Sequence, residues 1–136
     1  MLPKWHILYG VIFSLLVYFL FNISFFEGIL IFLSSIFIDF DHYLWYIYTK
    51  KDSSLKNAYN YLKNLRRNKP FLMIFHTVEF LLIFCFLSCV WKGFLFILIG
   101  ILFHSILDLI YLAYEKKLNQ GEFSLIKYFI KNAKKR

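Results

Sequence analysis

Charged and chain-breaking residues are scarce in this sequence. Of its 136 residues, 18% are charged and only two are prolines, whereas 60% are hydrophobic and 23% are aromatic. The mean hydropathy is +0.61. A soluble domain of this length cannot bury so much apolar surface in one core. The composition therefore excludes an ordinary soluble domain and indicates a single integral membrane domain over residues 1–136.

The sequence also lacks the short motifs of common soluble enzymes. It contains no GxSxG nucleophile elbow, no P-loop and no GxGxxG turn. Its two cysteines, Cys85 and Cys89, are four residues apart in an apolar segment, a spacing that is not the CxxC redox motif. We interpret both as small buried hydrophobic residues without a disulfide.

Four long apolar segments dominate what is present. They cover about residues 4–26, 27–48, 70–90 and 94–114, and the turn Trp91-Lys92-Gly93 separates the last two. Each is long enough to cross a hydrocarbon core of ~30 Å at ~1.5 Å per residue. The first is too long for the apolar core of a cleavable signal peptide, so we expect it to be retained. The predicted fold is an all-α bundle of four transmembrane helices.

Lysine and arginine are concentrated in residues 50–69 and 115–136. The positive-inside rule then places both termini and the long loop in the cytoplasm. Apolar residues recur at helical spacing in each stretch, which predicts two amphipathic helices on the inner membrane surface, beside anionic lipid headgroups. An alternative is that they frame an entrance for an anionic substrate. Membrane lipids, and not nucleic acid, are the expected partners. The apolar positions are Leu55, Ala58, Tyr59, Leu62 and Leu65, then Phe123, Ile126, Phe129, Ile130 and Ala133.

Ionisable residues inside the apolar segments are costly, at roughly 2.5–3.5 kcal/mol each near the centre of a membrane helix. Three pairs of histidine and carboxylate have a spacing of three or four residues, which puts both members on one helix face. All three pairs fall in the cytoplasmic half of their segments, and a fourth histidine lies at the inner end of the first segment. The pairs are Asp39 with His42, His76 with Glu79, and His104 with Asp108; the fourth histidine is His6.

Imidazoles and carboxylates that converge from four helices are typical of transition-metal sites. We predict one or two divalent ions, with zinc favoured and iron or manganese as alternatives. Asp41 lies about 160° around an ideal helix from Asp39, so it would bind a second metal, orient a ligand or be reached through local unwinding. Interhelical hydrogen bonds and an ion or proton pathway are the alternatives to a metal site. The predicted metal ligands are His6, Asp39, His42, His76, His104 and Asp108.

The order of these residues resembles that in the membrane-bound metal-dependent hydrolase family, whose bacterial members include a LexA-regulated inner-membrane protein. The resemblance covers the four-helix core and implies metal-dependent hydrolysis at the membrane. This chain has Phe71-Leu72 where the family has His-Arg, and Leu109-Ile110 where the family often has Thr-Pro. The motifs that carry it are Lys4-Trp5-His6, Asp39-x-Asp41-His42, Phe75-His76-Thr77 and His104-x-x-x-Asp108.

The residue pattern and the resemblance together predict a membrane-embedded hydrolase that acts at the cytoplasmic leaflet. A site at this depth suits a lipid ester or phosphoester near the headgroups. The metal would activate water, and Asp41 or Glu79 would be the general base. Two other functions stay open: a di-iron membrane oxidoreductase, and a non-enzymatic metal or proton carrier.

Overall fold

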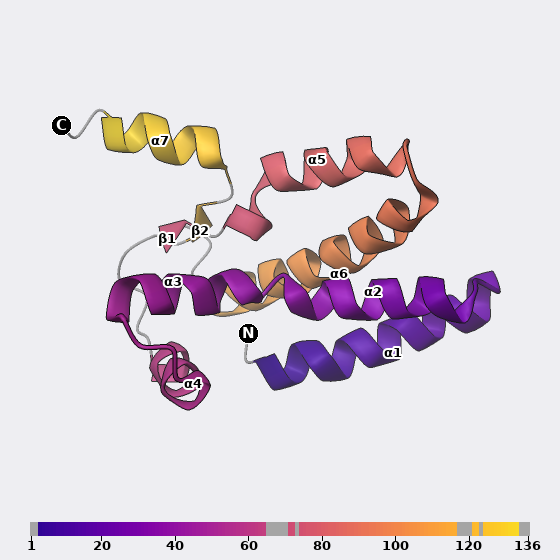
Figure 1. Cartoon of the computed structure of the whole chain (residues 1–136), viewed down its shortest axis with the longest axis horizontal. Coiled ribbons are helices and arrows are strands. Elements are labelled where there is room, and N and C mark those ends of the chain that lie inside the picture. The colour runs from indigo at the N-terminus through magenta and orange to yellow at the C-terminus, as the bar shows by residue number, and fades with distance from the viewer. Residues whose placement is uncertain (1–2, 65–70, 73, 117–120, 123, 134–136) are drawn as a thin grey trace.

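The computed structural model describes residues 3–64, 71–72, 74–116, 121–122 and 124–133. The regular structure of these residues is helical apart from two strands of two residues each, which confirms the all-α prediction. The body of the molecule consists of α1 (Pro3–Phe21), α2 (Phe25–Phe37), α5 (Val78–Ser88) and α6 (Lys92–Tyr114) (Figure 1). α2 packs against both α1 and α6, and α5 packs against α6.

The remaining elements gather at the end of the molecule where the chain begins (Figure 1). They are α3 (Phe40–Lys50), α4 (Leu55–Asn64), the 3-10 turn η1 (Ile74–His76) and α7 (Leu125–Ala133). Strand β1 (Phe71–Leu72) pairs in parallel with β2 (Gly121–Glu122), so the chain before η1 is tied to the chain before α7. At the opposite end, Lys92 Nζ lies 3.0 Å from Glu27 Oε1 and joins the α5–α6 turn to the start of α2.

The second apolar segment is not the continuous helix that its composition predicts. α2 ends at Phe37 and α3 begins at Phe40. At the break, the Asp39 amide donates to the Ile36 carbonyl (3.1 Å), three residues back, where a continuing α-helix would use the carbonyl of Ser35. The prediction of one helix over 27–48 is therefore wrong, although α3 continues roughly along the line of α2 (Figure 1).

The third apolar segment also departs from a single helix over 70–90. Thr77 has extended backbone angles, and its Oγ1 accepts a hydrogen bond from the Phe80 amide (3.4 Å), so Thr77 is the N-cap of α5. The predicted start at Pro70 lies outside the described residues. α5 has 11 residues, about 16 Å at 1.5 Å per residue, which is short of a ~30 Å hydrocarbon core.

Small residues allow α2 to approach its neighbours closely. A Cβ atom on Gly100 of α6 would collide with the Ile31 carbonyl and the Ser34 hydroxyl of α2. A Cβ on Gly10 of α1 would come within 2.6 Å of Ser35 Oγ. Close backbone contact of this kind is a common way to pack helices in membranes. It fixes the position of Ser35, which takes part in the site described below.

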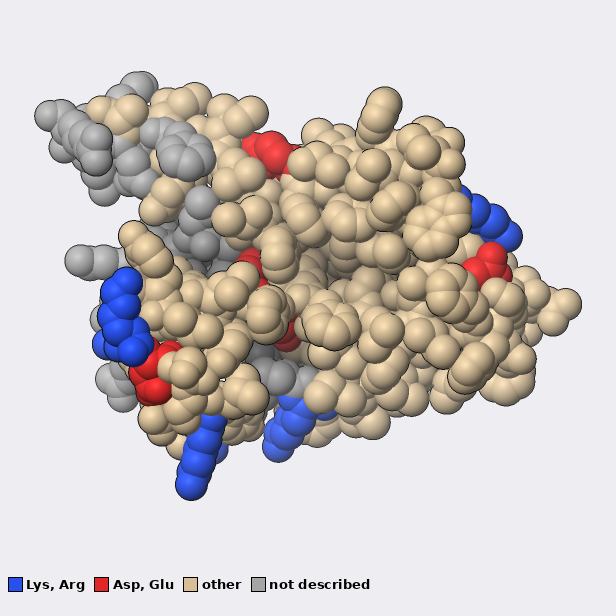
Figure 2. Space-filling model, in the orientation of Figure 1, with Lys and Arg blue, Asp and Glu red and all other residues tan. Residues whose placement is uncertain are grey.

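The outer surface of the helical body is apolar. Figure 2 shows a face on which uncharged side chains predominate and a few acidic side chains reach the surface between the two ends. α1 and α6 are long and apolar enough to cross a membrane, and only 22% and 28% of their apolar windows are buried, unlike the core helix of a soluble protein.

The structure contains both expected amphipathic helices, as α4 and α7. Leu65 and Phe123 of the predicted patterns lie outside the described residues. The interpretation of Cys85 and Cys89 as buried is wrong, because Cys85 on α5 and Cys89 at its C-cap are both exposed. α5 meets α6 through the face that carries Phe84, whose ring centroid is 5.9 Å from that of Phe94.

Candidate metal centre

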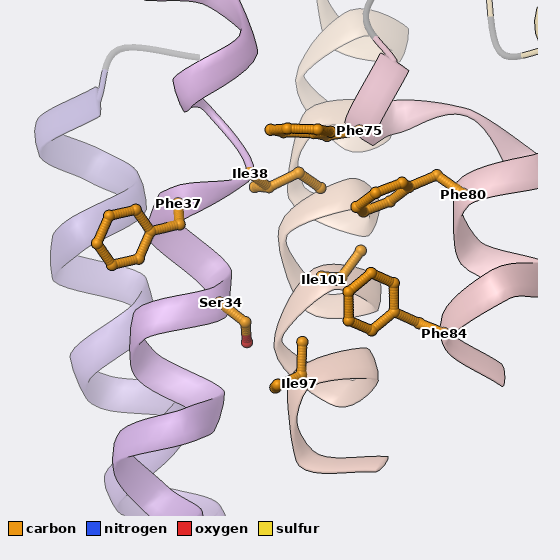
Figure 3. A pocket seen from close by; sticks show the side chains of 8 residues that line it. All are labelled: Ser34, Phe37, Ile38, Phe75, Phe80, Phe84, Ile97 and Ile101. Carbon is orange, nitrogen blue, oxygen red and sulfur yellow. The ribbon is translucent and has the colours of Figure 1, made fainter. Parts of the chain in front are cut away.

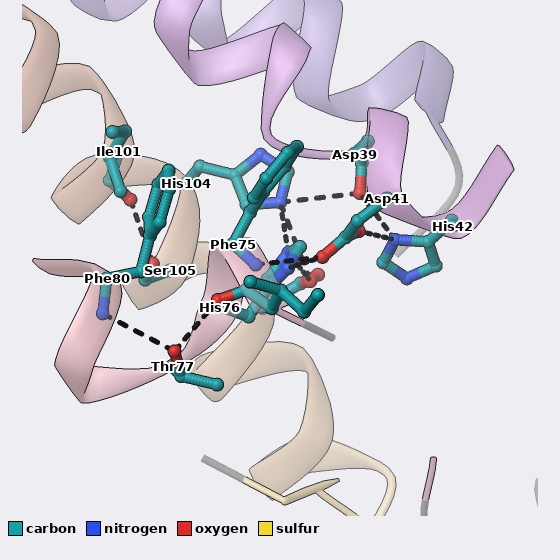
Figure 4. Close-up of polar contacts among 12 residues, drawn as sticks. Asp39, Asp41, His42, Phe75, His76, Thr77, Phe80, Ile101, His104 and Ser105 are labelled. Atoms are coloured by element: carbon teal, nitrogen blue, oxygen red, sulfur yellow. Dashed lines mark hydrogen bonds and ion pairs between the residues drawn. The ribbon is translucent and has the colours of Figure 1, made fainter. Parts of the chain in front are cut away.

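Histidine and aspartate side chains from α1, the α2–α3 break, α3, η1 and α6 form two adjoining groups. Figure 4 shows Asp39, His42, His76 and His104 of these groups, together with Asp41. The ligand atoms within each of two groups all lie within 4.8 Å of one another, and the two groups share Asp39. All six proposed ligands thus belong to one or the other of two groups that could hold a metal ion. One group is His6, Asp39, His104 and Asp108; the other is Asp39, His42 and His76.

His104 is fully buried on α6 and its ring orientation is set by the break in the neighbouring helix. Its Nδ1 donates to the Ser35 carbonyl at 2.7 Å. In a continuous helix that carbonyl would accept a hydrogen bond from the Asp39 amide. Because a carbonyl oxygen only accepts, Nδ1 carries the proton, and in the neutral ring Nε2 has a free lone pair.

His76 is oriented in the same way, but by a carboxylate. Its Nδ1 lies 3.2 Å from Asp41 Oδ2, the oxygen that also accepts from the Phe75 amide at 3.1 Å. A histidine whose Nδ1–H donates to a carboxylate presents Nε2 as a metal ligand, an arrangement common around protein-bound zinc. Asp41 therefore orients the His76 ring.

The spacing of the free imidazole nitrogens suits a shared cation. His76 Nε2 and His104 Nε2 are 3.3 Å apart, and Asp108 Oδ2 is 3.7 Å from the first and 3.6 Å from the second. Tetrahedral bonds of ~2.0–2.1 Å would place ligand atoms about 3.3–3.4 Å apart. With both rings neutral and protonated on Nδ1, the two Nε2 atoms could not hydrogen-bond to each other but could both bind one ion.

His6 gives independent support for a metal. The residue is 2% exposed and its ring stacks on that of His104, with centroids 4.0 Å apart. Neither of its ring nitrogens has a hydrogen-bond partner among the residues that the structure describes. His6 Nε2 instead points toward the carboxylates, 3.2 Å from Asp108 Oδ1 and 4.0 Å from Asp39 Oδ2. Because His6 Nε2 faces these carboxylates without hydrogen-bond geometry, a cation between the groups would bind the nitrogen and compensate the carboxylates.

His42 and Asp39 form the more open side of the centre. His42 Nδ1 lies 2.9 Å from Asp41 Oδ1 and 3.5 Å from Asp39 Oδ1. Asp39 is at the N-cap position of α3 but makes no capping hydrogen bond. Its carboxylate faces the histidines, with Oδ1 3.5 Å from His104 Nε2. Three carboxylates in so small a volume repel one another unless a cation compensates their charge.

Glu79, which the sequence places beside His76, does not belong to the centre. Its carboxylate accepts hydrogen bonds from the Ser124 hydroxyl (2.6 Å) and from the amides of Leu125 (3.0 Å) and Ile126 (3.3 Å). It therefore caps the N-terminus of α7. The predicted pairing of His76 with Glu79 on one helix face fails because η1 and Thr77 interrupt the helix between them.

Sequence reasoning missed two groups that shape the centre, the Ser35 carbonyl and the Phe75 amide. Both are backbone groups, so no side-chain pattern identifies them. The pair Ser34-Ser35, immediately before the break, is the one available signal, because it marks a close helix contact. No protein-family model, curated protein or solved structure matches the chain, so the centre is interpreted from its own geometry.

Proposed function

We propose that this protein is a membrane-embedded, metal-dependent hydrolase that cleaves a lipid ester or phosphoester at the cytoplasmic leaflet. The observation that carries the proposal is the triangle of His76 Nε2, His104 Nε2 and Asp108 Oδ2, with sides of 3.3, 3.6 and 3.7 Å. Nitrogen and carboxylate donors at this spacing suit zinc, and the same donor types accept iron or manganese. The resemblance noted in the sequence points to the same activity.

The residues of the centre would have different roles. His6, His76, His104, Asp39 and Asp108 would hold the cation, and His42 with Asp39 would complete a second position if two ions bind. When bound, such a cation supplies Lewis acidity that activates water and polarises an ester or phosphoester. Asp41 holds the Nδ1 proton of His76 and contacts His42 Nδ1, which places it to orient ligands and to exchange protons through His42. Hydrolysis would add water across one C–O or P–O bond and release an acid and an alcohol.

We place the centre at the cytoplasmic side of a four-segment membrane bundle with both termini in the cytoplasm. α1 and α6 would cross the membrane. α2 and α3, with 13 and 11 residues, would together span about 36 Å at 1.5 Å per residue. α5 would extend only partway across the hydrocarbon core. The basic helices α4 and α7 lie at the same end as the centre (Figure 1), where anionic headgroups would attract them.

The two alternative functions have less support. A di-iron oxidoreductase would use the same two overlapping groups, and iron content with oxygen consumption would reveal it. An ion or proton carrier would need polar groups beyond the centre. The core cluster on that side is apolar, with Val17, Ile31 and Phe96 at its middle.

Metal content tests the proposal directly. The full-length protein, purified in detergent and loaded with zinc, should contain one or two ions by elemental analysis. It should also hydrolyse a p-nitrophenyl ester or bis(p-nitrophenyl) phosphate. His104→Ala and Asp108→Asn should lose both metal and turnover.

Glu79→Gln is the control, because that carboxylate was predicted from sequence to act in the site but binds α7 in the structure. It should keep its metal. Stoichiometric metal in both His104→Ala and Asp108→Asn would overturn the ligand assignment, and metal without turnover on either substrate would count against the hydrolase.

A further inference from the structure

An apolar pocket lies between α2, α5 and α6 (Figure 3). It encloses about 150 Å³. An apolar cavity of ~150 Å³ in another protein stays dry and binds benzene. The one polar side chain in the lining is Ser34, and its hydroxyl donates to the Ile31 carbonyl of its own helix at 3.0 Å. The lining therefore offers a ligand apolar contact alone, which suits a hydrocarbon.

The pocket begins at the candidate metal centre. Three of its lining residues are Ile38, Phe75 and Ile101. Ile38 and Phe75 directly precede Asp39 and His76 in the chain, and Ile101 is three residues before His104 on the same face of α6. The amide of Phe75 also donates to Asp41. Each of the three chain segments that forms this end of the pocket thus carries a residue of the centre.

From there the pocket extends toward the opposite end of the bundle. Phe80 and Phe84 are one turn apart on α5, and Ile101 and Ile97 are one turn apart on α6, with Ile97 farther from the centre (Figure 3). The distance from His104 to Ile97 along α6 is about 10 Å at 1.5 Å per residue. Phe37 of α2 also lines the pocket, but its ring is 63% exposed and points away from the other lining side chains (Figure 3).

We propose that this pocket holds the hydrocarbon chain of a lipid substrate while the ester or phosphoester group lies among the histidines and aspartates. This inference rests on the proposed function, which it extends by assigning the substrate chain a site. Phe84 and Ile97, at the far end, set the length of chain that fits. The occupant is a lipid from the surrounding bilayer.

Photolabelling tests the assignment without relying on turnover. The zinc-loaded, full-length protein in nanodiscs would receive a trace of phosphatidylcholine with a diazirine in the middle of one acyl chain, and labelled peptides would be mapped by mass spectrometry. We expect labelling at Phe84 and Ile97. Ile97→Trp should reduce labelling at Phe84 about tenfold, the effect of losing roughly two buried methylene groups.

A second pocket provides the matched control. It lies between α1 and α2 and is lined by Leu15 and Tyr18 among others, and none of its lining residues is next in the chain to a histidine or aspartate of the centre. Leu15→Trp should leave labelling at Phe84 unchanged. Ile97→Phe is a milder variant in case Ile97→Trp does not fold, with the thermal midpoint of each variant as the check. For both variants, a shorter-chain phosphatidylcholine should compete for labelling better than it does in the wild type.

The outcomes separate the two proposals. Equal labelling of Phe84 in the wild type and both Ile97 variants would overturn the pocket assignment, because ordinary boundary lipid would explain it. Reduced labelling in the Ile97 variants together with a protein that binds no metal would support the lipid site and overturn the hydrolase.

Discussion

Asp41 joins two histidines that belong to different elements. One oxygen lies 2.9 Å from His42 Nδ1 in its own helix, and the other lies 3.2 Å from His76 Nδ1 in η1. The second oxygen also accepts from the Phe75 amide. A carboxylate with these contacts fixes ring orientation and tautomer, and residues of this kind typically change metal affinity 10–100-fold when replaced. The expected general-base role of Asp41 stays a prediction.

Asp41→Asn should therefore weaken metal binding about 10–100-fold, measured by competition with a chromogenic zinc chelator. The amide cannot accept from both histidines and the Phe75 amide at once, because one of its two terminal groups only donates. Asp52→Asn is a matched control, since Asp52 lies outside the centre and binds Tyr46, Ser54 and Asn57.

Three results are informative for Asp41. Weaker binding in Asp41→Asn alone supports the orienting role. Unchanged affinity with lost turnover would instead assign Asp41 as the general base. Unchanged affinity and unchanged turnover would contradict both roles.

The contact between α2 and α6 holds the two halves of the centre together. α2 leads into Asp39, and α6 carries His104 and Asp108. The two backbones meet at Gly100, where a Cβ would collide with the Ile31 carbonyl. A backbone atom cannot move aside as a flexible side chain can, so the helices would have to separate. The hydrogen bond from His104 to the Ser35 carbonyl lies one turn farther along the same contact.

Gly100→Ala should destabilise the protein by about 1–3 kcal/mol, the usual cost of overpacking a tight contact, and should also lower metal content. Thermal unfolding in detergent, with and without zinc, measures the first effect. Gly28→Ala is the control, because the nearest atom to its added Cβ is 3.9 Å away in Tyr18. Equal midpoints for the two variants would contradict the close contact.

At the scale of the whole molecule, charge and apolar surface are segregated. Exposed apolar residues cover the helical body, including Phe19, Phe86 and Val90, while α3, α4 and α7 gather beside the candidate metal centre (Figure 1). In Figure 2, lysine or arginine side chains are visible at the end of the molecule where α3 and α4 lie. The positive-inside rule would place that end in the cytoplasm. The turn that contains Lys92 would then face the other side of the membrane.

Cysteine labelling tests this orientation. In a background in which the exposed Cys85 and Cys89 are replaced by alanine, Lys92→Cys should react with a membrane-impermeant maleimide added outside intact cells. Lys63→Cys in α4 should react only after the cells are opened. Labelling of Lys63→Cys from outside would reverse the proposed orientation.

Several properties of this protein follow from local sequence. Charged residues are expensive in apolar segments, so the positions of Asp39, His76 and Asp108 alone predict that they share a site. Helical periodicity likewise predicts α4 and α7. The sequence predicts which residues could be ligands, because that depends on residue type. It also predicts the end of the molecule at which they lie, because that depends on distance along a helix.

Other properties depend on contacts between distant segments and were decided by the tertiary structure. The breaks at Ile38–Asp39 and at Thr77 replace two expected helices with shorter ones, and no proline or glycine marks them in the sequence. They are accompanied by long-range hydrogen bonds, from His104 to Ser35 and from His76 and Phe75 to Asp41. Through those bonds Asp41 contacts His76. Because the helix is interrupted after η1, the Glu79 carboxylate binds the start of α7 and not His76. A helix break of this kind leaves backbone groups without the partners that they would have inside a continuous helix. A prediction from periodicity assumes the continuous helix, so only the tertiary structure shows which side chains these groups bind.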